Sequence, residues 1–123
     1  MQRTDLKVLI FEDDKDLAQI LSMFLNTLDF KNIDLVSNEI STKKILENNK
    51  VYDLIILDTM INNKVVGPNF FDKITHNYKP TLTIATSANY LNKDFWDKRK
   101  VDYFFKKPYS LEKLEKLILK YFQ

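Results

Sequence analysis

The chain has 123 residues, enough to bury one hydrophobic core and too few for two, so we expect a single domain, residues 1–123, without an output module. The absence of cysteine excludes a disulfide framework, thiolate metal ligands and a cysteine nucleophile, so any bound metal must be held by oxygen. The formal net charge is only +2 and the lysines are scattered along the chain, which argues against direct nucleic-acid binding.

Short apolar runs alternate with segments of helical periodicity, which is typical of βαβ units around a parallel sheet. The third run is almost continuously apolar, as expected of a central strand that helices cover on both faces. We therefore predict a doubly wound α/β fold with five parallel strands and five helices on its two faces, and we adopt for it the strand order 2-1-3-4-5, one of the two common orders of such sheets. The predicted strands are Leu6 to Phe11, Ile33 to Val36, Tyr52 to Leu57, Thr81 to Thr86 and Tyr103 to Phe105.

The first predicted helix begins near Asp14 or Lys15, and Asp14 is a suitable N-cap. Its apolar residues recur at steps of three and four and comprise Leu17, Ile20, Leu21, Phe24, Leu25 and Leu28. The last predicted helix follows Pro108 and has Ser110 as its N-cap. Its buried face comprises Leu111, Leu114, Ile118 and Phe122.

Three further helices are predicted between these two. Ser37 or Asn38 caps a helix that carries the apolar residues Ile40, Ile45 and Leu46. Pro68 stands at a first-turn position and opens a helix that carries Phe70, Phe71 and Ile74. A short helix lies within Asn89 to Val101, and the sequence leaves open whether its Trp96 belongs to the core or to an interface.

Acidic side chains follow two predicted strands at the point where each strand ends. Glu12 and Asp13 come after the first strand, and Asp58 comes after the third. In the predicted order these strands are neighbours at the topological switch point, where open α/β sheets bind ligands, so the three carboxylates should converge. When carboxylates lie this close, either the pKa of one of them is raised or a cation binds between them. A site made only of oxygen ligands suits Mg²⁺.

Two more polar groups are expected at the same edge of the sheet. Ser87 follows the fourth strand and presents a hydroxyl, and Lys107 follows the fifth strand and presents an ammonium group. A carboxylate, a divalent cation, a hydroxyl and a lysine around one point are what is needed to carry a phosphoryl group on oxygen. The metal would neutralise two phosphoryl oxygens, and the remaining one would fall to Lys107 and Ser87.

Each of these residues has a simpler interpretation when it is taken alone. Acidic residues after a strand are often helix caps, Ser87 could bond local backbone in a turn, and Lys107 could be a solvated loop residue. Their joint placement at the ends of four predicted strands favours one functional site.

The chain resembles a response-regulator receiver domain, the phosphoacceptor module of two-component signalling, over residues 6 to 122. The resemblance implies a flavodoxin-like sheet and a signalling protein that is not an enzyme beyond its own phosphorylation and dephosphorylation. Five features match in order: the apolar strand ending in Glu12, Asp13 and Asp14; the strand-ending Asp58; the pair Ser87 and Ala88; Phe104, three places before the lysine; and the pair Lys107 and Pro108.

The resemblance implies roles for the acidic positions. Asp58 accepts the phosphoryl group from a phosphohistidine donor in a phosphorelay. Asp13 and Asp58 ligate Mg²⁺ directly, and Glu12 acts largely through the water around the metal. The backbone carbonyl of Met60, two residues past the acceptor, is the implied third protein ligand.

The resemblance also implies residues that respond to the phosphoryl group and residues that set how long it stays bound. Lys107 and Ser87 engage the phosphoryl group, and Ser87 and Phe104 are the implied switch residues. Met60 and Asn89, each two residues beyond a site residue, are implied to set the lifetime of the acyl phosphate.

The loop after Asp58 departs from the family pattern, because it contains no proline before Gly67 and its glycine comes one place late. Before the fifth strand, Lys100 and Val101 replace the small glycine-alanine step common in the family. The segment between Ser87 and Lys107 is also slightly short. These departures alter the loop and the region of the fourth helix and leave the five matching positions intact.

Three alternative functions remain open. A degenerate receiver that binds partners without phosphorylation is favoured by the altered loop and disfavoured by the complete set of site residues. A phosphatase-type hydrolase would be expected to have a second acidic residue where Met60 stands. Flavin binding, as in flavodoxins, would need a phosphate-binding loop after the first strand, where Glu12 and Asp13 would repel the ligand.

Partners and location follow from the resemblance and from the termini. The implied partners are a sensor histidine kinase or a histidine phosphotransfer protein and a downstream effector protein, and a homodimer is allowed. The N-terminus lacks a signal-peptide core, and no run approaches the roughly 20 apolar residues of a membrane span, so we expect a cytoplasmic protein with no membrane segment.

Overall fold

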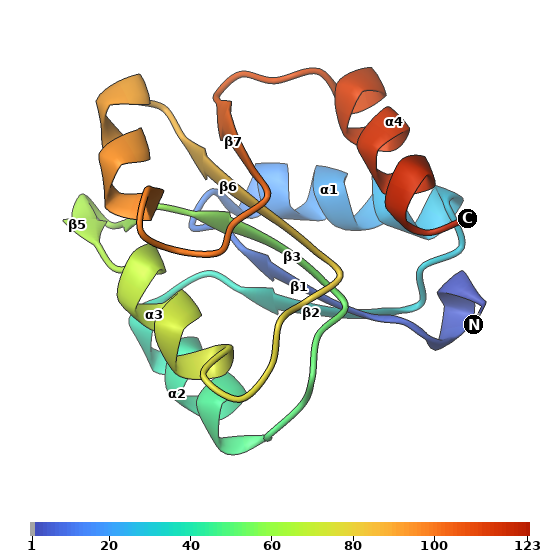
Figure 1. The fold of residues 1–123 in the computed structure, drawn as a ribbon, viewed down its shortest axis with the longest axis horizontal. Coiled ribbons are helices and arrows are strands. Elements are labelled where there is room, and N and C mark those ends of the chain that lie inside the picture. The colour runs from blue at the N-terminus through green and yellow to red at the C-terminus, as the bar shows by residue number, and fades with distance from the viewer. Residues whose placement is uncertain (1) are drawn as a thin grey trace.

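The central sheet of the computed structural model, which describes residues 2–123, has five parallel strands in the order β2-β1-β3-β6-β7 (Figure 1). This order confirms the predicted arrangement 2-1-3-4-5, and the observed strand ends differ from the predicted ones by at most two residues. The strands are β1 (Lys7–Phe11), β2 (Asn32–Val36), β3 (Leu54–Asp58), β6 (Leu82–Ser87) and β7 (Tyr103–Lys106). Central β3 is buried at all five positions, as its apolar run predicted.

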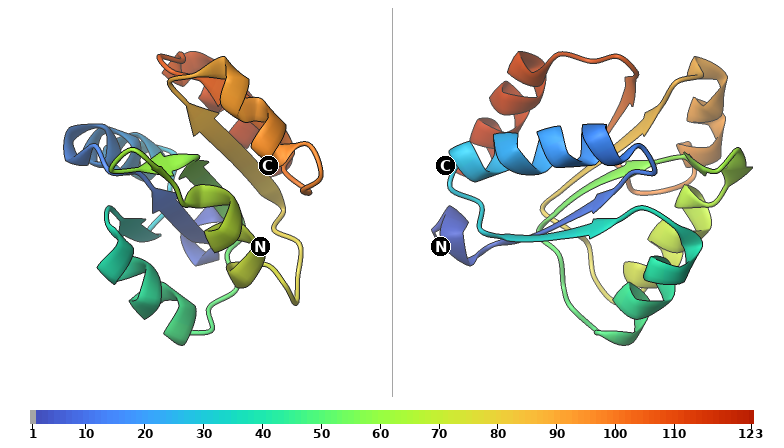
Figure 2. Two further views of the ribbon diagram at one scale, coloured as in Figure 1. Left: turned by 90° about the vertical axis from the view of Figure 1, so that its left-hand side faces the viewer. Right: turned by 180° about the vertical axis from the view of Figure 1, so that it is seen from behind.

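Helices cover the sheet on both faces, as the doubly wound fold requires (Figure 2). Helices α1 (Lys15–Thr27) and α4 (Leu111–Tyr121) lie side by side on one face, over Val8, Ile10 and Ile56. Helices α2 (Glu39–Glu47) and α3 (Gly67–Ile74) and the 3₁₀ helix η2 (Tyr90–Trp96) occupy the other face, over Leu9, Phe11 and Ile55. A one-turn 3₁₀ helix, η1 (Arg3–Asp5), precedes β1.

The predicted helix caps are confirmed. Asp14 Oδ1 accepts hydrogen bonds from the backbone N–H groups of Asp16 and Leu17 at the start of α1. Asn38, rather than Ser37, caps α2 through a reciprocal pair of hydrogen bonds with Ser41. Ser110 Oγ accepts the N–H of Lys113 and caps α4. These side chains satisfy backbone donors that the first turn of each helix leaves free.

The fourth helix is shorter and tighter than predicted. The prediction placed it within Asn89 to Val101, whereas η2 ends at Trp96. Trp96 is a core residue, only 2% exposed, whereas the neighbouring Phe95 is 43% exposed. The open question about Trp96 is therefore answered in favour of the core.

A small hairpin after β3 was not predicted. Strands β4 (Met60–Ile61) and β5 (Lys64–Val65) pair antiparallel in the loop that departs from the family pattern. Asn62 and Asn63 form its turn with φ of 50° and 64°. Two positive φ angles in a two-residue loop are those of a type I′ turn, and asparagine adopts them more readily than most residues.

None of the helices within residues 2–123 combines the length and the apolar character needed to cross a membrane.

Candidate functional site

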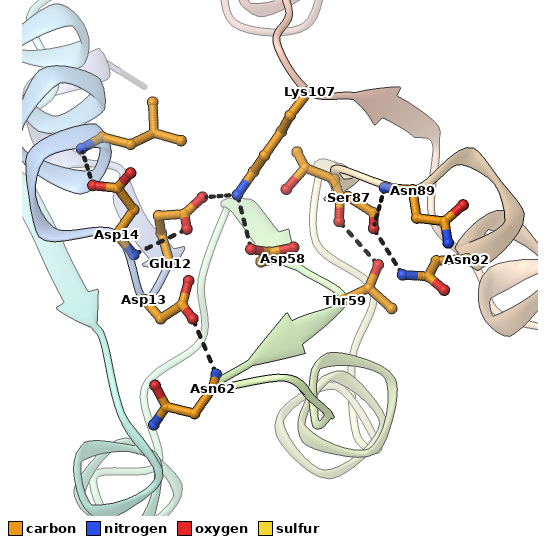
Figure 3. Close-up of polar contacts among 12 residues, drawn as sticks. Glu12, Asp13, Asp14, Asp58, Thr59, Asn62, Ser87, Asn89, Asn92 and Lys107 are labelled. Atoms are coloured by element: carbon orange, nitrogen blue, oxygen red, sulfur yellow. Dashed lines mark hydrogen bonds and ion pairs between the residues drawn. The ribbon is translucent and has the colours of Figure 1, made fainter.

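Three acidic side chains meet at the carboxyl edge of the sheet, where the sequence predicted them. Strands β1 and β3 are neighbours in parallel register, with Phe11 opposite Leu57, so Glu12, Asp13 and Asp58 emerge together (Figure 3). One oxygen from each carboxylate lies within 4.8 Å of the others. Glu12 and Asp58 are buried, and Asp13 is half-buried.

Lys107 joins two of these carboxylates from the end of β7. Its Nζ lies 2.5 Å from Glu12 Oε1 and 2.8 Å from Asp58 Oδ2. The backbone N–H of Lys107 donates to the carbonyl of Ser87 at 2.8 Å, which extends the pairing of β6 and β7 into the site. The structure therefore brings Glu12, Asp13, Asp58 and Lys107 together.

The electrostatics of the site are those of a crowded, partly desolvated cluster. Burial, supported by the charge of Asp58, raises the pKa of Glu12 to about 7 against the opposing hydrogen bond from Lys107. Burial would lower the pKa of Lys107, but the hydrogen bonds and charges of Asp58 and Glu12 outweigh it and hold that pKa above its usual value. Lys107 thus partly balances the acidic cluster.

Asp13 and Asp14 have different roles although they are adjacent. Asp13 Oδ2 accepts the backbone N–H of Asn62 at 3.0 Å and so ties the β4-β5 turn to the acidic edge. Asp14 is exposed and serves as the cap of α1. Its backbone N–H donates to Glu12 Oε2 at 3.2 Å, which orients the buried carboxylate.

Met60 begins the hairpin two residues beyond Asp58. Met60 lies opposite Val65 on the partner strand. The next pair along the hairpin, Ile61 opposite Lys64, flanks the two-residue loop. In an antiparallel hairpin these pairs alternate between bonded and non-bonded, so the Met60 carbonyl is directed away from the partner strand. The role of this carbonyl as a metal ligand, which the family resemblance implied, stays a prediction.

Gly67 is a site residue whose function the sequence did not reveal. A Cβ atom at this position would lie 2.1 Å from the carbonyl oxygen of Asp58. The Gly67 N–H donates to the carbonyl of Thr59 at 3.0 Å, so the start of α3 is bonded to the backbone just after Asp58. That Gly67 is the only glycine in the chain was the available signal.

Ser87 is buried at the end of β6, and its hydroxyl is engaged with η2. Ser87 Oγ accepts the backbone N–H of Asn89 at 3.1 Å and the side-chain amide of Asn92 at 2.8 Å. Figure 3 shows this group beside Asn89 and Asn92, whereas Lys107 Nζ lies between Glu12 and Asp58. The structure therefore brings Ser87 to the edge of the site without joining its hydroxyl to the acidic cluster.

The remaining predicted positions have structural contacts of their own. Phe104 is half-buried, packs against the core beneath α3 and η2, and stands opposite Ala85 in the sheet. Asn89 caps η2, because its side-chain oxygen accepts the N–H of Leu91 at 3.0 Å. Neither contact tests the switch or lifetime role, and both roles stay predictions.

The donor set fits a hard divalent cation. The clustered side-chain ligands are carboxylate oxygens, two of them buried, and Mg²⁺ prefers such ligands together with retained water. The ammonium of Lys107 shares the cluster and is available to a further anion. The arrangement can therefore hold a metal ion, present a carboxylate nucleophile and neutralise added negative charge.

Residues 8–119 match the sequence family described as the response regulator receiver domain. Comparison with curated proteins finds no match. The N-terminal domain of a protein from Wolinella succinogenes is 24% identical with a TM-score of 0.77, over 94% of this chain and 91% of that one. A signal receiver domain of a two-component histidine kinase from Clostridium thermocellum is 18% identical with a TM-score of 0.81, over 97% and 98% of the two chains.

A third similar structure was determined with a metal ion. The receiver domain of a sensor histidine kinase from Pseudomonas aeruginosa, with magnesium coordinated in its active-site cleft, is 18% identical with a TM-score of 0.72. The alignment covers 95% of this chain and 97% of that one. At this level of identity the likeness establishes the shared fold.

Proposed function

The chain belongs to the response regulator receiver domain family, and we propose that it is a phosphoacceptor in which Asp58 takes a phosphoryl group from a phosphohistidine. The observation that carries this proposal is the convergence of Asp58 with Glu12, Asp13 and Lys107 at one edge of the sheet. The donor would be a sensor histidine kinase or a histidine phosphotransfer protein, and the modified surface would act on an effector protein.

The proposed reaction uses Asp58 as the nucleophile. Its carboxylate oxygen attacks the phosphorus, the bond from phosphorus to the histidine nitrogen breaks, and an acyl phosphate forms. Asp13, Asp58 and the Met60 carbonyl would hold Mg²⁺, with Glu12 acting through water. When bound, Mg²⁺ supplies positive charge to the phosphoryl oxygens.

Lys107 and Ser87 would respond to the new charge. The phosphoryl group adds nearly two negative charges at Asp58, and Lys107 already lies 2.8 Å from that carboxylate. Ser87 would turn toward the group and leave its bonds with η2, and Phe104 would follow as the second switch residue. The phosphate biases an existing equilibrium, because it can act only through its different interaction with the two states.

The proposal predicts Mg²⁺-dependent phosphorylation at a single residue. Incubation with acetyl phosphate and Mg²⁺, followed by intact-mass measurement, should show the gain of one phosphoryl group. Asp58→Ala should abolish the gain, because no other carboxylate occupies the acceptor position. Asp97→Ala, which removes an exposed aspartate outside the cluster, should leave it unchanged.

A wild-type protein that gains no mass would contradict the proposal. That result would instead favour a receiver that binds its partners without phosphorylation, the alternative that the altered loop after Asp58 suggests.

Mg²⁺ binding predicts a second measurement. Saturating Mg²⁺ should raise the thermal unfolding temperature of the wild type by about 3 °C or more, since a ligand that binds only the folded state stabilises it. Asp13→Asn should lose most of this shift, although its amide oxygen can still accept the Asn62 N–H. Without Mg²⁺ the variant should be at least as stable as the wild type, because one of three clustered negative charges is gone.

The matched control for Asp13 is its neighbour. Asp14→Asn retains a side-chain oxygen for the cap of α1 and lies outside the metal cluster, so it should keep the Mg²⁺-dependent shift. An equal shift in Asp13→Asn and in the wild type would remove Asp13 from the metal site.

Met60 and Asn89 are proposed to set the lifetime of the acyl phosphate. The apolar side chain of Met60 follows the acceptor by two residues and is half-buried, so it would hinder an attacking water. Met60→Asn should therefore speed dephosphorylation, measured as the decay of the phosphorylated mass peak after removal of the donor, and an unchanged decay rate would reject this role of Met60.

A further inference from the structure

The hydroxyl of Ser87 is held away from the acidic cluster by two donors. Asn92 donates its side-chain amide at 2.8 Å, and Asn89 donates its backbone N–H at 3.1 Å (Figure 3). Ser87 is 3% exposed and Asn92 is 9% exposed, so both partners of the shorter bond are shielded from water. The bond therefore cannot be exchanged for bonds to bulk solvent while the core stays packed.

We propose that Asn92 is a positioning residue that holds Ser87 in the orientation of the unphosphorylated state and opposes phosphorylation of Asp58. This inference rests on the proposed phosphoacceptor function. Ser87 can reach an acyl phosphate on Asp58 only by rotating its hydroxyl away from η2. The rotation leaves the buried amide of Asn92 without its partner, which is a free-energy cost of the active state.

Of the two donors, only Asn92 acts through its side chain. The bond from Asn89 comes from the backbone N–H and would persist with any residue at position 89 except proline. The Asn89 side chain is used elsewhere, because it accepts the N–H of Leu91 and caps η2. The identity of the residue at position 92 therefore determines how strongly Ser87 is held.

The short helix that carries Asn92 has an independent anchor. Trp96 is 2% exposed, and its Nε1 donates to Thr59 Oγ1 at 2.9 Å. Thr59 Oγ1 in turn donates to the carbonyl of Thr86 at 2.9 Å. This anchor should keep η2 in place when Asn92 is replaced, so a variant at position 92 tests the hold on Ser87 and not the folding of the helix.

The same contact would transmit the state of the site to the surface. When Ser87 turns toward Asp58, the amide of Asn92 loses its partner, and Asn92 lies in the same helix as Leu91, which is 76% exposed. Phosphorylation and the loss of the bond between Asn92 and Ser87 are thus coupled, so a partner that draws Asn92 away from Ser87 should favour phosphorylation.

The test measures the binding of beryllofluoride, a stable analogue of the phosphoryl group, in the presence of Mg²⁺. It compares the wild type with variants at position 92. Asn92→Leu preserves side-chain volume without the amide donor, and Asn92→Ala removes both. Either variant should lower the half-saturating beryllofluoride concentration by about tenfold, because the active state no longer leaves a buried amide unpaired. Asn77→Ala, at an exposed asparagine after α3, should leave it unchanged.

A double-mutant cycle separates positioning from a general effect on stability. In a Ser87→Ala background the Asn92 substitutions should no longer change the half-saturating concentration, because there is no hydroxyl left to hold. A tenfold shift that persists without the hydroxyl, or no shift in the single variants, would overturn the inference. A wild type that gains no phosphoryl group from acetyl phosphate would instead overturn the proposed function itself.

Discussion

Gly67→Ala should lower the free energy of unfolding by about 3 kcal/mol or more, because the new methyl group meets backbone atoms that cannot turn away. The added Cβ would lie 2.1 Å from the Asp58 carbonyl oxygen and 3.1 Å from both the Asp58 carbonyl carbon and Thr59 Cα. Asp58 belongs to the central strand, and Gly67 is bonded to the Thr59 carbonyl, so neither side can yield without losing hydrogen bonds. Urea unfolding measures the effect.

The same substitution should impair the site. Any displacement that relieves the contact must move the backbone of Asp58, the proposed acceptor, so phosphorylation by acetyl phosphate should be slower in Gly67→Ala at a temperature where the variant is folded. Asn69→Ala is the matched control, since it adds no atom near Asp58 and lies exposed in the same helix. Its stability should stay within about 0.5 kcal/mol of the wild type. A Gly67→Ala protein as stable as this control would show that the loop is far more compliant than its contacts indicate.

Lys107→Met should lower stability at pH 8 by about 2 to 4 kcal/mol, because it leaves two buried carboxylates without their shared cation. The ammonium lies 2.5 Å from Glu12 Oε1 and 2.8 Å from Asp58 Oδ2, and its own side chain is only 19% exposed. Methionine is close to lysine in length and apolar volume, so the loss reports the charge and its hydrogen bonds more than packing. Lys106→Met, at the exposed neighbour, should have little effect.

The raised pKa of Glu12 makes the stability of the folded protein depend on pH. The pKa of Glu12 is about 7 in the folded protein against 4.5 as its ordinary value, so between these values the folded state binds more protons than the unfolded state. Stability therefore falls as the pH rises from about 4.5 to about 7. Removing Lys107 also removes the hydrogen bond that lowers this pKa, so in the variant the fall should continue above pH 7.

The measurement is urea unfolding of the wild type and Lys107→Met at pH 5.5 and at pH 8. The difference between the two proteins should be smaller at pH 5.5, where Glu12 holds a proton in both. Mg²⁺ at pH 8 should restore part of the variant's stability by replacing the missing positive charge. A loss of equal size at both pH values would mean that the pairing with Glu12 contributes little, and that Asp58 or packing accounts for the role of Lys107.

Much of the site could be predicted because, in a parallel sheet, residues that follow the strands in sequence all lie at the same edge of the sheet. Once the apolar runs are interpreted as strands in the order 2-1-3-4-5, the residues that follow strands one, three and five must meet at one edge. Glu12, Asp58 and Lys107 are far apart in the chain and lie in direct contact. The caps at Asp14 and Ser110 were also accessible, since each bonds within three residues of itself.

The missed features depend on contacts that no local pattern encodes. The β4-β5 hairpin has a turn of two asparagines without the glycine that usually signals it. The steric demand at Gly67 comes from the Asp58 carbonyl, and the bond between Trp96 and Thr59 joins residues 37 positions apart. The single glycine of the chain marked position 67 as unusual, but neither spacing nor composition identified the partners in these contacts.

The sequence by itself therefore determined the fold class from hydrophobic periodicity and, with the strand order 2-1-3-4-5 adopted, the edge at which the acidic groups and the lysine gather. Tertiary structure alone decided which way each group faces: Lys107 toward Glu12 and Asp58, and Ser87 toward Asn92. The physical reason is that periodicity places a residue along an element, whereas its hydrogen-bond partner is chosen by the packing of elements distant in the chain.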